Sequence, residues 1–150
     1  MENRKKLHDY GLIMILFGVL DLVTFISDII PAFTSGDFKQ KLSEAGALGI
    51  VVTSVTIALT VLIVLADVFL GIKALKVSKK PTADKGYIIV TMVFLVLSAL
   101  SVIACVVALF DATDIFGKIL DLLLAVATSA IYFLFVQAAN AVRNDVINGK

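Results

Sequence analysis

The most constraining feature of this chain is a set of four long apolar runs, which occupy residues 11–30, 47–72, 87–110 and 119–139. A bilayer core about 30 Å thick is crossed by about 20 helical residues, because an α-helix rises about 1.5 Å per residue. Each run reaches that length. None shows the alternation of polar and apolar residues that is typical of a transmembrane β-strand. We therefore expect an all-α integral membrane protein with four transmembrane helices.

The composition and the breaks between the runs indicate how these helices are organised. Hydrophobic residues make up 60% of the 150 residues and charged residues only 17%, outside the usual range of soluble domains. The first run follows basic residues but is longer than the core of a signal peptide, so we interpret it as the first span. Pro81 separates two pairs of runs, and Thr82 or Asp84 is available to cap the third helix. The sequence predicts one four-span domain over residues 1–150, an antiparallel bundle of two hairpins.

The distribution of Lys and Arg predicts the orientation of the spans. Ten of the thirteen basic residues fall in the N-terminal segment, the second connection and the C-terminal segment, and three fall in the first and third connections. Because short cytoplasmic loops are enriched in Lys and Arg, we expect both termini to be cytoplasmic. A basic rim on that side would contact anionic lipid headgroups. Its residues are Lys73, Lys76, Lys79, Lys80 and Arg143.

Asp21 is the polar residue that most needs an explanation. If the first span enters the membrane near Tyr10, Asp21 lies about 16 Å deep, where an acidic residue costs about 2.5 to 3.5 kcal/mol. The four runs contain no Lys, Arg or His that could neutralise it. We expect Asp21 to face the bundle interior, to be protonated, to meet hydroxyl or amide partners, or to line water. The candidate ion or proton site consists of Asp21, Thr24, Asp28 and Thr60.

The remaining polar residues of the spans are predicted to lie nearer the two membrane surfaces. An acidic outer mouth is expected from Asp111, Asp114 and Asp121. Polar anchors are expected at the inner ends of the second and fourth spans, where Lys73, Lys76 or Arg143 could reach Asp67. These anchors are Asp67, Gln137 and Asn140. Stripes of hydroxyl and small residues along the spans are compatible with close helix packing, and also with a transport path lined by hydroxyl groups.

The sequence lacks the residues that most enzyme classes require. Cys105 is the only cysteine and His8 the only histidine, which is too few for thiol chemistry or for a Cys and His metal site. No nucleophile motif accompanies His8, and no glycine-rich phosphate loop is present. The basic residues fit lipid better than nucleic acid. We expect no enzymatic activity, no metal and no cofactor.

Two functions from different classes agree with these observations. In the first, the protein is a non-enzymatic scaffold or accessory subunit, in which the polar stripes pack helices and the charged rims contact lipid or a partner. In the second, it is a cation- or proton-coupled transporter or channel subunit with a midplane carboxylate at Asp21. Four helices enclose little space, so transport would need a homo-oligomer or a larger membrane complex. The organisation resembles that of many small four-span bacterial proteins, which implies a multi-pass protein of the bacterial cytoplasmic membrane.

Overall fold

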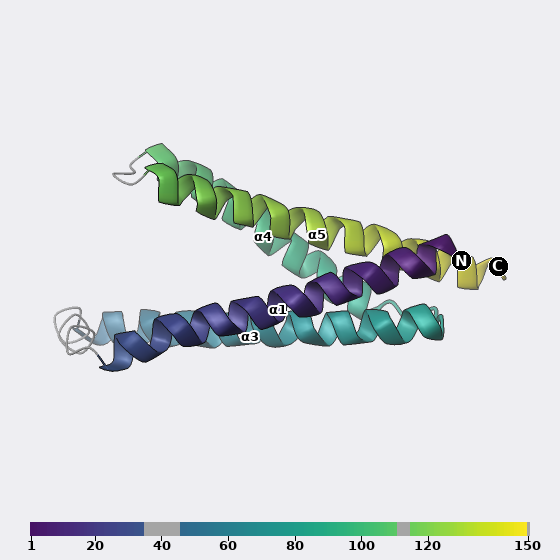
Figure 1. The fold of residues 1–150 in the computed structure, drawn as a ribbon, viewed down its shortest axis with the longest axis horizontal. Helices are drawn as coiled ribbons and strands as arrows, with labels where there is room; N and C mark the ends of the chain where they lie inside the picture. Colours follow the sequence, from purple (N-terminus) through teal and green to yellow (C-terminus); the bar gives the residue numbers. More distant parts are fainter. Residues whose placement is uncertain (35–45, 111–114, 150) are drawn as a thin grey trace. The chain divides into compact units, whose positions relative to one another are not determined.

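Four long helices account for most of the part of the chain that the computed structural model describes, which is residues 1–34, 46–110 and 115–149, without the side chains of residues 28, 32, 33 and 56 (Figure 1). Each helix is long and apolar enough to cross a membrane. The expectation of an all-helical protein with four candidate spans is therefore confirmed. The helices are α1 (Glu2–Thr34), α3 (Gly46–Lys79), α4 (Gly86–Phe110) and α5 (Ile115–Ile147).

The helices are longer than the apolar runs that predict them. Helix α1 has 33 residues, or about 50 Å at 1.5 Å per residue, against a bilayer core of about 30 Å. It begins at Glu2, whose carboxylate pairs with Lys6 one turn later at 2.7 Å. At its other end it includes Pro31, and the Thr34 hydroxyl donates to the Ile30 carbonyl at 2.8 Å. Polar residues thus extend the helix beyond the run at both ends.

The connection between α3 and α4 has the predicted cap. Helix α3 ends at Lys79, two residues before Pro81, where proline excludes a further helical turn. The Gly86 backbone N–H donates to Asp84 Oδ1 at 2.9 Å, so of the two residues predicted as possible caps, Thr82 and Asp84, Asp84 caps α4. The helical spacing of Phe38, Leu42 and Ala45 also predicts a short interfacial helix in the first connection, and these residues lie outside the described part of the chain.

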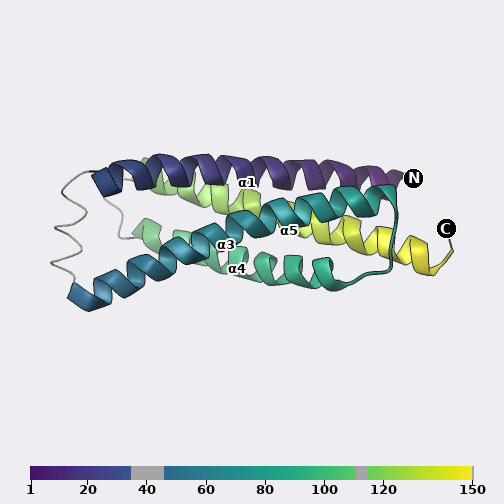
Figure 2. The same cartoon turned by 90° about the horizontal axis from the view of Figure 1, so that it is seen from below.

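The chain divides into two compact units, of which unit 1 comprises Met1–Leu12 and Ile72–Lys150. Within it, α4 and α5 pack side by side (Figures 1 and 2). Tyr87 meets Phe135 edge to face, with ring centroids 6.2 Å apart, and Ser129 lies within hydrogen-bond distance of Ser98, at 3.0 Å between the two hydroxyl oxygens. The buried Thr91 hydroxyl donates to the Tyr87 carbonyl at 2.8 Å. Aromatic packing and the contact between the two serine hydroxyls together hold this helix pair.

Unit 2 comprises Ile13–Gly71 and contains the apolar parts of α1 and α3. The two helices approach closely at Gly18, where a Cβ atom would lie 3.0 Å from Val68 Cγ2 and 3.3 Å from Asp67 Cβ. Met14 and Leu70 are buried in the same unit. A glycine at this position lets two helix backbones come together, as small residues commonly do in membrane helices.

Large apolar side chains lie exposed on the faces of all four helices. Examples from the four are Leu16, Leu65, Ile103 and Leu124, each more than half exposed. Water-soluble monomers rarely expose contiguous apolar surface on this scale, whereas lipid tails solvate it readily. These faces fit the class of proteins that the apolar runs indicate. Insertion into a membrane, the antiparallel arrangement and a single domain stay predictions.

Candidate functional site

The structure brings together three of the four residues of the candidate ion or proton site. Asp21, Thr24 and Thr60 line a groove of about 390 Å³ within unit 2. Asp21 and Thr24 are exposed, and Thr60 is half-buried. The side chain of Asp28 lies outside the described residues. We call this pocket the Asp21 groove; Phe25, Ile63 and Val64 complete its lining.

Helical spacing explains why these residues share one groove. Asp21, Thr24 and Phe25 stand at positions i, i+3 and i+4 of α1 and so lie on one face, and the lining residues of α3 follow the same spacing. Gly18, one turn earlier on α1, carries no Cβ that would crowd Val68 and so allows the two helices to approach closely. Sequence analysis did not identify Gly18, although a glycine inside an apolar run is the signal that could have found it.

Asp21 lies at the surface of unit 2, so α1 and α3 do not by themselves enclose its carboxylate. In lipid an uncovered carboxylate is costly, and a hydroxyl donor, a water-filled space or protonation is required to accommodate it. The groove itself offers hydroxyls, on Thr24 and Thr60. It therefore combines a group that can take up a proton with groups that can donate and accept hydrogen bonds.

The inner-end anchors lie in different surroundings. Asp67 is buried, with 5% of its surface exposed, beside Gly18. Two of the cations considered for it have partners in unit 1: Lys73 pairs with Asp84 at 3.1 Å, and Arg143 Nε donates to the Ala83 carbonyl at 3.4 Å. An ion pair between Asp67 and a cation of the rim stays a prediction.

The amide anchors of α5 lie within unit 1. Gln137 is exposed and lines a pocket of about 330 Å³ together with Asn3, Lys6 and Tyr10 from the start of α1. Asn140 is half-buried one turn further along α5. Near the chain ends, the Asn3 amide donates to the Asp145 carboxylate at 3.0 Å. Polar contacts thus join the first turns of α1 to the last turns of α5.

Of the predicted acidic mouth, only Asp121 belongs to the described residues. Its carboxylate is exposed and pairs with Lys118 at 3.2 Å, which offsets its charge locally. Asp111 and Asp114 lie outside the described residues. A cation-attracting mouth on this side stays a prediction.

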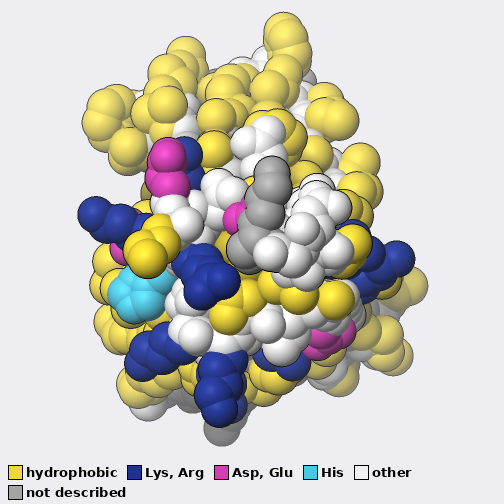
Figure 3. All heavy atoms as spheres, turned by 90° about the vertical axis from the view of Figure 1, so that its right-hand side faces the viewer, with side chains coloured by type: hydrophobic (Ala, Val, Ile, Leu, Met, Phe, Trp, Pro, Cys, Tyr) yellow, Lys and Arg dark blue, Asp and Glu magenta, His cyan; other side chains and the backbone are white. Residues whose placement is uncertain are grey.

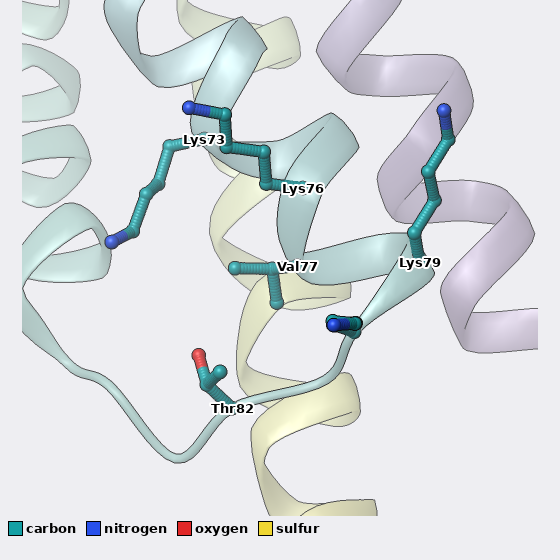
Figure 4. A pocket seen from close by; sticks show the side chains of 6 residues that line it. Lys73, Lys76, Val77, Lys79 and Thr82 are labelled. Atoms are coloured by element: carbon teal, nitrogen blue, oxygen red, sulfur yellow. The ribbon is translucent and has the colours of Figure 1, made fainter.

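The four lysines of the basic rim line a third pocket, which lies in unit 1. Figure 4 shows the end of α3 and the connection that follows it, around a pocket of about 450 Å³. Its lining consists of Lys73, Lys76, Val77, Lys79, Lys80 and Thr82, and we call it the lysine pocket. Both chain ends lie at the same end of unit 1, where Lys and Arg side chains gather on the surface (Figures 1 and 3).

No group of three or more His, Cys, Asp or Glu side chains that could hold a metal ion occurs within residues 1–34, 46–110 and 115–149. Fold and groove together define a class: helical proteins with four candidate membrane spans and a polar groove between two of them. No protein-family model, curated protein or solved structure matches the chain.

Proposed function

We propose that this protein is a non-enzymatic scaffold or accessory subunit of the bacterial cytoplasmic membrane, which works as a homo-oligomer joined through the Asp21 groove. The single observation that carries the proposal is the exposed carboxylate of Asp21 in a groove between two apolar helices. If α1 spans the membrane, this carboxylate lies about 16 Å from the entry point, where lipid cannot solvate it. Another protein surface is the natural cover.

A second copy of the chain is the cover that best matches the groove chemically. The four apolar runs contain no cation, so an ion pair with another span of this chain is excluded as the means of compensation. The groove instead carries a carboxylate acceptor, Asp21, and a hydroxyl donor, Thr24, one turn apart. Across a two-fold axis the same surface meets itself, and each Thr24 can donate to the Asp21 of the other copy. Interhelical hydrogen bonds of this kind contribute about 0.6 kcal/mol each on average.

The pairing is tested by cysteine cross-linking in membranes. In a Cys105→Ala background, Thr24→Cys is expected to form a disulfide-linked dimer under mild oxidation, because the two-fold pairing brings the two positions together. Val19→Cys is the matched control, since it is also exposed but lies on the opposite side of α1. Equal cross-linking at both positions, or none at Thr24→Cys, would count against the pairing.

The groove also supports a second candidate function, a cation- or proton-coupled transporter or channel subunit. The observation in its favour is the grouping of one carboxylate with the hydroxyls of Thr24 and Thr60. In reconstituted liposomes, Asp21→Asn should then abolish ion or proton flux, because the amide keeps the size of the side chain and cannot ionise. Wild-type flux no different from that of empty liposomes would rule out transport by the protein alone and leave the scaffold function.

A further inference from the structure

The lysine pocket concentrates positive charge within a few residues. Lys73, Lys76, Lys79 and Lys80 all line it, and Lys73 pairs with Asp84 at 3.1 Å. Among the described residues, no carboxylate lies within ion-pair distance of the other three lysines. Three ammonium groups therefore have no carboxylate partner; Figure 4 shows the Lys76 and Lys79 side chains extending away from Val77, so their flexible stems must turn for the ammonium groups to meet one ligand.

The pocket has an apolar floor and a hydroxyl on its far wall. Val77 is buried, with 2% of its surface exposed, and Figure 4 shows it between Lys76 and Thr82. The Thr82 side chain, on the connection after α3, extends toward the same space (Figure 4). A volume of about 450 Å³ lies within the range of small-molecule sites.

Three contacts position the connection that forms the far wall. Lys73 holds Asp84 from α3, and Arg143 Nε of α5 donates to the Ala83 carbonyl at 3.4 Å. Asp84 is also bonded to the Gly86 backbone N–H at the start of α4. Residues on three helices thus set the position of the connection. A wall fixed before binding lowers the entropy lost when a ligand binds.

We propose that the lysine pocket binds a phosphate group, such as that of an anionic lipid headgroup. Three ammonium donors and a hydroxyl suit a ligand with several charged oxygens, which phosphate provides. The C-terminal carbonyls of α3 disfavour an anion, but the three unpaired lysines outweigh the half charge of a helix end. If α3 spans the bilayer, its last turns lie beyond the apolar run at headgroup level. The proposal is independent of pairing at the Asp21 groove.

Binding is tested on the full chain in a neutral detergent, by titration with short-chain phosphatidic acid and, separately, with inorganic phosphate. The test variant is the triple substitution Lys76→Gln, Lys79→Gln and Lys80→Gln. Its matched control is Arg4→Gln, Lys5→Gln and Lys6→Gln, which removes the same charge from the same end of unit 1 outside the pocket. We expect the test variant to bind phosphatidic acid about a hundredfold more weakly and the control to change by less than about threefold.

The two ligands distinguish the source of the phosphate. Displacement of phosphatidic acid by millimolar inorganic phosphate would assign the pocket to free phosphate, and failure of inorganic phosphate to compete would assign it to lipid; either result supports phosphate recognition. No binding of either ligand, or equal losses in the two triple variants, would overturn the proposal. Thr82→Val, which keeps every charge, should weaken binding about tenfold and guards against misfolding of the triple variant.

Discussion

At the scale of single residues, the burial of a side chain on α1 depends on what it meets on the adjoining helix α3. Gly18 and Asp21 are one turn apart on α1, yet Gly18 is buried against α3 and Asp21 lies in an open groove. The glycine allows the close approach, and the groove begins where that approach ends. Packing and the candidate site are therefore coupled through one helix turn.

Gly18→Leu tests this coupling. A Cβ at position 18 would already lie 3.0 Å from Val68 Cγ2 and 3.4 Å from the Val64 carbonyl oxygen, so a larger side chain must push the helices apart. We expect a loss of about 1 to 3 kcal/mol in the free energy of unfolding, measured by steric trapping in bicelles. Val19→Leu, at an exposed neighbouring position, should change it by less than about 0.5 kcal/mol. Unchanged stability in Gly18→Leu would contradict the close packing.

At the scale of helices and their connections, Asp84 joins α3 to α4. Its carboxylate accepts hydrogen bonds from the Gly86 backbone N–H and from Lys73, and the positive charge of Lys73 adds to their effect, so the pKa of Asp84 is held below its ordinary value. In the unfolded chain, where these partners are lost, the pKa returns to about 3.9. The contribution of Asp84 to stability is thus present above that value and is lost as the pH falls through the lowered pKa.

A pH series on Asp84→Asn tests this contribution. At pH 6 the wild type should have the higher unfolding temperature, by a small margin because the groups are exposed and screened. Toward pH 3 the difference in unfolding temperature should shrink. Protonation then neutralises Asp84 in the wild type, whereas the asparagine of the variant is neutral at both pH values. Thermal scans in bicelles at both pH values provide the measurement. A margin that is the same at pH 3 and pH 6 would show that ionisation of Asp84 does not contribute.

How far the sequence predicts these elements depends on how strong the local signal is. The four apolar runs predict four helices because hydropathy and length are local properties of the sequence, and the polar residues after Pro81 predict a cap at Thr82 or Asp84 for the same reason. The face of α1 that turns toward α3 is harder to predict, since a uniformly apolar helix has nearly the same composition toward lipid and toward protein. The Asp21 groove depends on packing between segments distant in sequence, whereas the residues that line the lysine pocket all lie between Lys73 and Thr82.

At the scale of the whole molecule, the basic residues predict which ends of the helices face the cytoplasm. In a Cys105→Ala background, Lys80→Cys should be protected from an impermeant thiol reagent in intact cells and should react after permeabilisation. Lys118→Cys, in the third connection region, should react in intact cells. Both positions are exposed, so access across the membrane decides the labelling. The reverse pattern would overturn the proposed orientation.

The central claim is that the Asp21 groove joins two copies of this chain in the membrane, and counting subunits tests it most directly. Fluorescently tagged protein is reconstituted at low density in liposomes, and single-molecule photobleaching steps are counted. The wild type and Val19→Leu should bleach mainly in two steps. Asp21→Leu should bleach in one step, because lipid accommodates leucine and no second copy is required to cover it. Single-step bleaching of the wild type, or two steps in Asp21→Leu, would contradict the claim.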